Sequence, residues 1–259
     1  TPKLIAKLYK HIVTNGEIFQ TNSLTAEIVK TLENAYRDVR IAFSTEIVRY
    51  CDINNIDFYK VRDKVNKLLA QSDTATTDPN AVPSGGLLIP MLGVGGHCLP
   101  KDGILLWWRN MQKGNDTSAS LILASRLIND DSPSYTFKQA EKAFGDLRNK
   151  KIALLGVAYR FNSEDTRNSP TVALANYLRE NNVNYIMHDP YVKADDQNLL
   201  KYNQQDHFTS DINKALESAD YIFMGTAHKE YIDNFESIVS RKNIQGVMDA
   251  CNIYNSNQF

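Results

Sequence analysis

The chain has 259 residues, of which 42% are hydrophobic and 23% charged, a composition that allows one large globular domain or two smaller ones. Its 29 basic and 30 acidic side chains leave a formal net charge of -1, so charge gives no reason to expect nucleic acid or an anionic membrane as a partner. We find no apolar stretch near the roughly 20 residues of a membrane-spanning helix and no signal-peptide pattern, and we expect a cytoplasmic protein.

The most regular helical pattern runs from Leu24 to Cys51. Apolar side chains recur every three or four positions along it, at Ile28, Leu32, Ala35, Val39, Ala42, Phe43 and Ile47. This spacing predicts an amphipathic helix. Because its apolar positions cover more than one stripe, we expect a second copy of the chain to pack against it. A second helix is predicted from about Asp57 to Leu69, and the Ser, Thr, Pro and Gly content of residues 71–90 predicts a loop.

The segment MLGVGGHCLPKDGILLWW, residues 91–108, follows that loop, and helical periodicity then extends from about Ile104 to Asn129 with an interruption near KGND. After about residue 149 short apolar runs alternate with helical stretches at 169–181, 211–217 and 230–240. The apolar runs are KIALLGVAY, VNYIMHDP, ADYIFMGTA and GVMDAC. Such alternation predicts a parallel sheet flanked by helices. We expect a lead-in over 1–20, a helical domain over 21–148 and an α/β domain over 149–259.

The glycines before Cys98 do not form a dinucleotide-binding loop. Gly93, Gly95 and Gly96 have the first spacing of G-x-G-x-x-G but lack its third glycine and a preceding strand. LLGVAY, residues 154–159, follows a predicted strand with a single glycine. A zinc site at His97 and Cys98 is also disfavoured, because adjacent side chains point apart and the sequence offers no second ligand pair. We therefore expect neither a dinucleotide fingerprint nor a metal site in this chain.

The three cysteines, Cys51, Cys98 and Cys251, are far apart and odd in number, which indicates reduced thiols rather than a disulfide framework. Cys98 lies between a glycine turn and a predicted helix, next to Lys101 and Asp102, where neighbouring cations favour a nucleophilic sulfur. A free cysteine is also commonly a small buried hydrophobic residue. The local sequence leaves both interpretations of Cys98 open, whereas we expect Cys51 and Cys251 to be core residues.

Two further polar groups are candidates for a site. Lys30 and Asn34 are four residues apart and share a helix face with Arg37, although a polar face is commonly just solvated. In FNSEDTRNSP, residues 161–170, Asp165 and Arg167 precede a helix that Ser169 would cap. A loop after a parallel strand is where open α/β sheets bind ligands, and a simple capped loop is the alternative.

Five sequence segments occur in order along the chain. They are TAEIVKTLENAYRDVRIAFSTE, GVGGHCLPKD, RLIND, GVAYRFNSEDTRNSP and HDP. Read together, they resemble the central helix, the catalytic cysteine loop, the end of the connecting helix and the start of the nucleotide-sugar domain of the UDP-glucose/GDP-mannose dehydrogenase family. The form GVGGHC is similar to the branch of that family that oxidises UDP-N-acetylhexosamines such as UDP-N-acetyl-D-mannosamine.

The resemblance implies an α/β protein in which an all-helical central dimerisation domain precedes a Rossmann-like, parallel-sheet domain that binds a UDP-sugar. It also implies that the family's N-terminal NAD-binding Rossmann domain is absent from this chain, so that we expect a fragment that is inactive alone. The implied reaction is the NAD-dependent oxidation of a sugar C6 alcohol to a carboxylate by two hydride transfers. The implied context is a homodimeric enzyme of polysaccharide biosynthesis.

The resemblance assigns catalytic roles to four residues: Cys98, Lys30, Asn34 and Asp102. Cys98 would form a thiohemiacetal and then a thioester at C6, which water would hydrolyse. Lys30 would stabilise the developing oxyanion and Asn34 would position a hydroxyl or a water, while Asp102 would assist that water or hold Lys30. A non-catalytic nucleotide-sugar-binding or regulatory dimer is the alternative function, but such a protein needs no thiol.

Substrate contacts are implied for five residues: Tyr159, Arg160, Lys101, Gly95 and Gly96. Arg167 matches an arginine that reaches the NAD cofactor in the family. Two positions depart from the family pattern. No arginine occurs between Arg62 and Arg109, where the family has a substrate-binding arginine shared across its dimer, and Cys251 stands where relatives carry an arginine.

Overall fold

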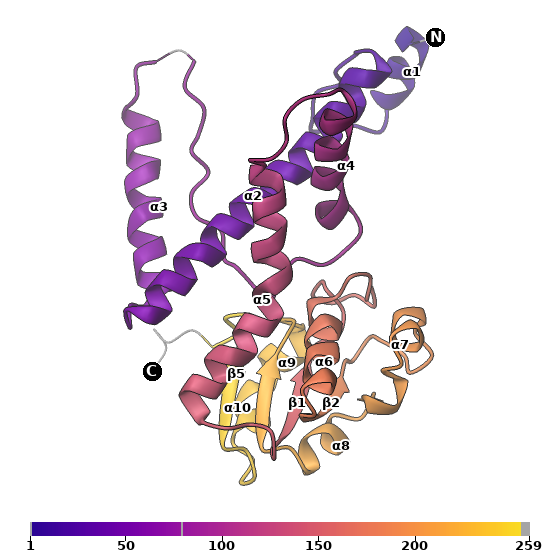
Figure 1. Ribbon diagram of the computed structural model, residues 1–259. Coiled ribbons are helices and arrows are strands. Elements are labelled where there is room, and N and C mark those ends of the chain that lie inside the picture. The colour runs from indigo at the N-terminus through magenta and orange to yellow at the C-terminus, as the bar shows by residue number, and fades with distance from the viewer. Residues whose placement is uncertain (1, 79, 255–259) are drawn as a thin grey trace.

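The computed structural model describes residues 2–78 and 80–254, which form a helical part and an α/β part (Figure 1). Five helices make up the first part: α1 (Pro2–Tyr9), α2 (Ser23–Ile53), α3 (Phe58–Ala75), α4 (Cys98–Gln112) and α5 (Leu121–Phe144). α5 continues from the helical part down to the sheet (Figure 1). The expected order, a helical domain followed by an α/β domain, is confirmed.

Helix α2 is the scaffold of the helical part. It begins where the side chain of Asn22 accepts a hydrogen bond from the backbone N–H of Thr25 over 2.8 Å, a cap that satisfies one of the free donors of the first turn. Small side chains at Ala35 and Ala42 are buried, where α2 packs against both α4 and α5. This close packing fixes the position of α2 relative to the start of α4.

The α/β part contains a parallel five-stranded sheet in the order β3-β2-β1-β4-β5. The strands are β1 (Lys151–Leu155), β2 (Asn184–His188), β3 (Phe208–Thr209), β4 (Tyr221–Met224) and β5 (Gly246–Asp249). The connections contain α6 (Pro170–Glu180), α7 (Gln197–Lys201), the 3-10 helix η1 (Gln205–His207), α8 (Ile212–Glu217), α9 (Lys229–Asp233) and α10 (Phe235–Val239). The winding reverses between β1 and β4, so the loops after these two strands flank the crevice where open α/β sheets bind ligands.

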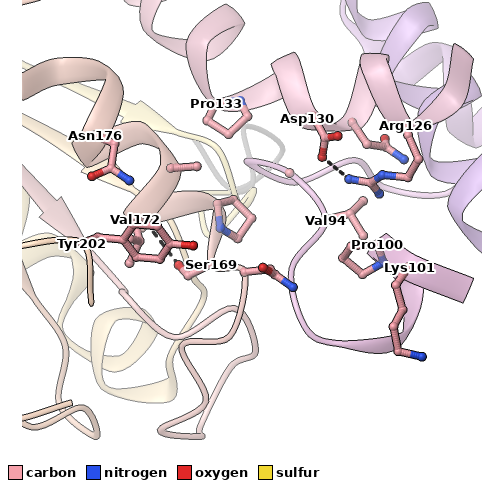
Figure 2. Close-up of a pocket in the computed structure, with 15 residues that line it drawn as sticks. Val94, Pro100, Lys101, Arg126, Asp130, Pro133, Ser169, Val172, Asn176 and Tyr202 are labelled. Atoms are coloured by element: carbon pink, nitrogen blue, oxygen red, sulfur yellow. Dashed lines mark hydrogen bonds and ion pairs between the residues drawn. The ribbon is translucent and has the colours of Figure 1, made fainter. Parts of the chain in front are cut away.

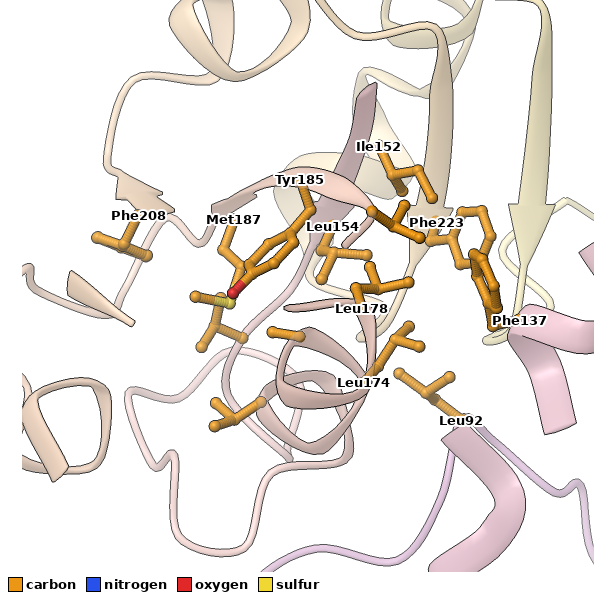
Figure 3. Close-up of a cluster of buried hydrophobic side chains, with 14 of the residues drawn as sticks. Leu92, Phe137, Ile152, Leu154, Leu174, Leu178, Tyr185, Met187, Phe208 and Phe223 are labelled. Carbon is orange, nitrogen blue, oxygen red and sulfur yellow. The ribbon is translucent and has the colours of Figure 1, made fainter. Parts of the chain in front are cut away.

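Both faces of the sheet are buried. Ile152 and Leu154 of β1 pack on one face with Leu174 of α6 (Figure 3), whereas Ala153 and Leu155 pack on the other face with α8, α9 and α10. Successive residues of a strand point to opposite faces. A strand buried on both faces is therefore apolar wherever it is buried, as IALL, residues 152–155, is.

The helical part contributes to the core of the sheet. Leu92, which precedes α4, and Phe137 of α5 are each 2% exposed and belong to the same apolar cluster as Ile152 and Leu174 (Figure 3). The segment that leads to Cys98 is therefore anchored in the α/β part.

Helix α5 continues through Pro133, although we predicted that helical periodicity ends at about Asn129. An interior proline removes one helical hydrogen bond and disfavours the helix by about 3 kcal/mol or more. Here the hydroxyls of Ser132 and Ser134 donate to helix carbonyls near the proline, and Phe137 and Ala140 are buried beyond it. Tertiary packing thus outweighs the local preference.

Other expectations also differ from the structure in detail. α3 continues to Ala75, which lies inside the segment 71–90 that we predicted as a loop. The helical stretch predicted over 230–240 is divided into α9 and α10 at Asn234. The short edge strand β3 was not predicted, because two residues carry no periodicity.

Candidate active site

Asn34 of α2 and Asp102 of α4 form the buried floor of the candidate site. The Nδ2 group of Asn34 donates a hydrogen bond to Oδ2 of Asp102 over 2.6 Å, and Nζ of Lys101 lies 2.7 Å from Oδ1 of the same carboxylate. Asn34 and Asp102 are buried, whereas Lys101 is partly exposed. Both carboxylate oxygens are thus paired with donors from two helices.

These donors decide the ionisation of Asp102. Burial alone would raise the pKa of its carboxyl, but the hydrogen bonds from Lys101 and Asn34, together with the charges of Lys101 and Lys30, hold that pKa below its ordinary value. Lys30 acts on Asp102 only through its charge, since its Nζ lies 3.6 Å from Glu33 on the exposed side of α2. Of the two cations near Asp102, Lys101 is the one that pairs with it.

Cys98 is the first residue of α4 and is exposed, whereas Cys51 and Cys251 are buried, as expected for those two. The predicted helix start near Ile104 was therefore too late, because the apolar periodicity begins only after the first turn. Pro100 is compatible with that first turn, where backbone N–H groups have no helical partner. The sulfur of Cys98 thus lies at a helix end that favours negative charge.

Two cations are within electrostatic reach of Cys98. The pKa of Lys101 is raised by its hydrogen bond to Asp102 and, to a smaller extent, by the charge of Cys98. The pKa of Arg167 is raised chiefly by its hydrogen bond to Asp165, at 2.5 Å, with a small contribution from Cys98. The structure therefore brings Arg167, which follows β1, to the neighbourhood of the cysteine.

Tyr159 fills the space beside the glycines of the cysteine loop. A Cβ atom on Gly95 would lie 2.3 Å from Cβ of Tyr159, and one on Gly96 would lie 2.9 Å from the Tyr159 ring. Gly96 also has φ +85, a left-handed conformation that favours glycine. Its N–H donates to the carbonyl of Arg167 over 2.8 Å, and Nδ2 of Asn168 donates to its carbonyl over 2.9 Å. These glycines permit close approach of two loops.

The loop after β1 is itself held by hydroxyl groups. Ser169, Thr171 and Thr226 donate to the three carbonyls of residues 156–158 over 2.5–2.7 Å. Ser169 also caps α6, as predicted, by accepting the N–H of Val172. Arg160 lies in the exposed part of this loop.

A cavity of about 390 Å³ lies between α5, α6 and the cysteine loop. Lys101 and Arg126 line one side, and Asn176 and Tyr202 line the other (Figure 2). Arg126 is buried and pairs with Asp38 of α2 at 2.6 Å. Cys98 does not line this cavity, so the cavity adjoins the thiol without containing it.

A single glycine, Gly156, follows β1. A Cβ atom on it would lie 2.6 Å from the backbone nitrogen of Thr226, so the loops after β1 and β4 approach each other closely there. The printed sequence contains no G-x-G-x-x-G pattern. Across residues 2–78 and 80–254, no group of three or more His, Cys, Asp or Glu side chains is arranged to hold a metal ion.

Two segments of the chain match models of one protein family. Residues 24–131 match the central domain of the UDP-glucose/GDP-mannose dehydrogenase family, and residues 153–256 match its UDP binding domain. The chain belongs to this family. The two matched segments correspond to the helical part and to the α/β part.

Among the members of this family, UDP-N-acetyl-D-mannosamine dehydrogenase of Pyrococcus horikoshii is 32% identical over 255 residues, which cover 96% of this chain and 53% of that protein. The Campylobacter jejuni protein of the same name is 31% identical over 228 residues, and the match covers 88% of this chain and 51% of that protein. The chain thus spans about half the length of the curated relatives that it matches.

Solved structures of the family agree. The Pyrococcus horikoshii UDP-D-ManNAc dehydrogenase superposes with a TM-score of 0.75 at 32% identity, over 98% of this chain and 54% of that one. The NDP-N-acetyl-D-galactosaminuronic acid dehydrogenase of Methanosarcina mazei superposes with a TM-score of 0.78 at 26% identity, over 100% of this chain and 53% of that one. In the part of the chain that the structure describes, no helix is both long and apolar enough to cross a bilayer.

Two buried residues at the carboxyl edge of the sheet were missed from the sequence. Asp189 directly follows β2 in the HDP segment, and His228 follows β4. Their position at the ends of parallel strands is the signal that would have indicated them.

Proposed function

We propose that this chain is the substrate-binding and thiol-bearing portion of an NAD-dependent nucleotide-sugar 6-dehydrogenase. The observation that carries the proposal is the position of Cys98, an exposed thiol at the start of α4. It has Lys101 and Arg167 within electrostatic reach. Asp102, four residues further along α4, is buried and accepts a hydrogen bond from Asn34 of α2. A protein that only binds a nucleotide sugar has no use for a thiol in this position.

The proposed substrate is a UDP-N-acetylhexosamine such as UDP-N-acetylmannosamine. The names of the two curated relatives and the UDP binding domain match support this choice. Tyr159 and Arg160 follow β1 at the crevice where the winding of the sheet reverses, and an exposed guanidinium suits a diphosphate. The glycines Gly95 and Gly96 would admit the sugar close to the backbone of the cysteine loop.

In the proposed mechanism, Cys98 reacts with the aldehyde formed by the first oxidation. Its thiolate adds to C6, so that a C–S bond forms and the carbonyl oxygen becomes the oxyanion of a thiohemiacetal. After the second oxidation the intermediate is a thioester. Addition of water to C6 then breaks the C–S bond and gives the carboxylate and the free thiolate.

The side chains around Cys98 suit these steps. Lys30 would stabilise the oxyanion by its charge, and Asn34 would orient a hydroxyl or a water. Asp102, which stays ionised at neutral pH because its pKa is lowered, would accept a proton from the attacking water or fix Lys101.

NAD would accept the hydride in both oxidations, and residues outside this chain would hold most of the dinucleotide, because this chain contains no G-x-G-x-x-G loop. Arg167 is the residue of this chain that we assign to cofactor contact, since it is exposed next to the cysteine loop. Free thiols fit a reducing compartment, and we place the enzyme in the cytoplasm.

We further propose that the enzyme is a homodimer that assembles through α2. Large apolar side chains on α2 are exposed in the single chain, namely Leu24, Ile28, Val29, Leu32, Tyr36, Phe43, Tyr50 and Ile53. An apolar patch of this extent on a soluble protein marks a contact surface.

The decisive experiment measures NAD reduction by the full-length protein that contains this chain, with UDP-N-acetylmannosamine as substrate. We expect two NADH for each sugar and no turnover in Cys98→Ser, while Cys51→Ser, a buried thiol away from the site, keeps the activity. One NADH for each sugar, or full activity of Cys98→Ser, would contradict the thioester route. Tight UDP binding without any NAD reduction would favour the non-catalytic binding dimer.

A further inference from the structure

The short segment that carries Tyr159 and Arg160 is fastened at both ends. On its N-terminal side, the backbone N–H groups of Val157 and Ala158 donate to Oδ2 of Asp189 over 2.7 and 2.8 Å. On its C-terminal side, the backbone N–H of Asn162 donates to Nδ1 of His228 over 2.9 Å. The residues between these two anchors are 159–161.

The two anchors are joined to each other. Nε2 of His228 lies 3.0 Å from Oδ2 of Asp189, and both side chains are fully buried. Because Nδ1 of His228 accepts the N–H of Asn162, the proton of this ring lies on Nε2 and is donated to Asp189. One hydrogen-bonded pair therefore holds both ends of the segment.

Asp189 makes a complete set of hydrogen bonds. Besides Val157, Ala158 and His228, its Oδ1 accepts the N–H groups of Tyr191 and Val192 over 2.9 and 3.2 Å. Burial opposes ionisation, but the hydrogen bonds from His228 and from the backbone donors keep the pKa of Asp189 below its ordinary value.

A buried charge of this kind is not needed for a stable sheet core, since apolar residues of similar volume commonly serve as well. The pair instead ties together the loops that follow β1, β2 and β4, whose carboxyl ends form the ligand-binding edge of the sheet. Asn162 strengthens the link, because its Oδ1 accepts the N–H of Lys229, the residue after His228.

The segment between the anchors also supports the cysteine loop. Tyr159 is the residue whose side chain contacts Gly95 and Gly96, and its own N–H donates to the carbonyl of Asp165 over 2.9 Å. A shift of this segment would therefore move Arg160 and, through the glycines, the loop that ends at Cys98.

We propose that Asp189 and His228 are positioning residues, which set the place of Arg160 in the nucleotide-sugar site and the place of the Cys98 loop through Tyr159. The part of this inference that concerns Arg160 rests on the proposed function. The part that concerns the cysteine loop rests on the contacts alone.

The test uses Asp189→Asn and His228→Phe in the 259-residue chain, with two readouts. The first is the dissociation constant of UDP by calorimetry, and the second is the alkylation rate of Cys98 by iodoacetamide, read on its peptide by mass spectrometry. Cys51 and Cys251 are buried, so the rapid reaction reports Cys98. Urea unfolding of each variant establishes that it is folded under the assay conditions.

The matched control is Asp220→Asn. Asp220 also accepts a backbone N–H of β1, that of Lys151 over 2.9 Å, but at the opposite end of the strand. We expect Asp189→Asn to weaken UDP binding by about tenfold, because it weakens buried hydrogen bonds that position the binding segment. The same variant should change the Cys98 alkylation rate several-fold. Asp220→Asn should leave both readouts within about twofold.

Wild-type UDP affinity and wild-type Cys98 reactivity in folded Asp189→Asn would overturn the inference. If Asp189→Asn does not fold, His228→Phe decides by the same criteria, because the ring is replaced by one of similar shape without its two nitrogen atoms. If the wild-type chain binds no UDP, the proposed function fails, and the alkylation rates still decide whether the pair positions the cysteine loop.

Discussion

Tyr159 occupies the space that a side chain at Gly95 would need, since a Cβ atom there would lie 2.3 Å from Cβ of Tyr159. Gly95→Ala should therefore push the cysteine loop away from the loop after β1. We expect the turnover of the full-length protein to fall by about 100-fold, the scale of a displacement near 1 Å in an active site. Steady-state kinetics and the alkylation rate of Cys98 measure the effect.

Gly114→Ala is the control for that substitution. Gly114 has φ +82, and no atom lies within 4 Å of the position of an added Cβ. Alanine there should lower the free energy of unfolding by about 1 kcal/mol through backbone strain and leave Cys98 unaffected. Equal effects of the two substitutions on Cys98 would contradict the contact with Tyr159.

Asp102 should make the stability of the fold depend on pH. Its pKa is lowered in the folded chain, so its contribution is present above the ordinary carboxyl pKa of about 4 and is lost as the pH falls through the lower folded value. Asp102→Asn should cost roughly 1–3 kcal/mol at pH 7 and progressively less toward pH 3. Thermal unfolding of the wild type and Asp102→Asn across this pH range measures the effect, with Asp233→Asn, at an exposed carboxylate, as the control. A stability difference between wild type and Asp102→Asn that does not change with pH would show that Asp102 is not paired.

The buried pair of Asp38 and Arg126 links α2 to α5 over 2.6 Å. Arg126→Met should destabilise the chain by about 3–5 kcal/mol, because it leaves a carboxylate buried without its cation. The double variant Asp38→Leu/Arg126→Met should recover most of this loss. Urea unfolding of the four proteins of the cycle measures the coupling, and additive losses would rule out a direct interaction.

Leu92 anchors the cysteine loop in the core of the sheet, with 2% of its surface exposed. Leu92→Ala should lower the free energy of unfolding by about 2–5 kcal/mol and alter the alkylation rate of Cys98. Leu127→Ala, at a side chain that is 72% exposed on α5, should change stability by no more than about 0.5 kcal/mol. A loss of stability without any change at Cys98 would show that the anchor does not control the loop.

The proposed dimer can be tested on α2. Leu32 is 55% exposed in the single chain, and Leu32→Glu should convert a dimer to a monomer in sedimentation at micromolar concentration, because a charge in an apolar contact is strongly disfavoured. Ile232→Glu, at a position in α9 that is 50% exposed, should leave the dimer intact. A wild-type chain that sediments only as a monomer would contradict assembly through this face.

Periodicity was sufficient to predict the long helix α2, because its apolar side chains repeat over several turns, and short apolar runs were sufficient to predict the four main strands. It failed where tertiary contacts outweigh local preference, as in the passage of α5 through Pro133, and where an element is too short to repeat, as in β3. The start of α4 was misplaced because the apolar periodicity begins only after its first turn, in which Cys98 is exposed.

The site was predicted in the same uneven way. Asn34, Cys98 and Asp102 were proposed as site residues through motif resemblance, and their roles stay a prediction. The contact between Asn34 and Asp102 required the fold, since the two residues are 68 positions apart. The HDP segment that contains Asp189 was noted only as part of the resemblance, and neither Asp189 nor His228 was singled out, because the partners of a buried polar residue after a strand are distant in sequence. Their hydrogen bonds to backbone groups are visible only once three loops are in place.

Leu92 lies in the core of the sheet, and Cys98 begins a helix of the other part. Residues 93–97 connect the α/β part to the helical part. They include the glycines that contact Tyr159 and the loop after β1. Any rotation of the helical part against the sheet would therefore be converted into a displacement of the sulfur relative to Arg160. The thiol of Cys98 therefore lies at the junction between the helical part and the α/β part, at the end of the segment that joins them.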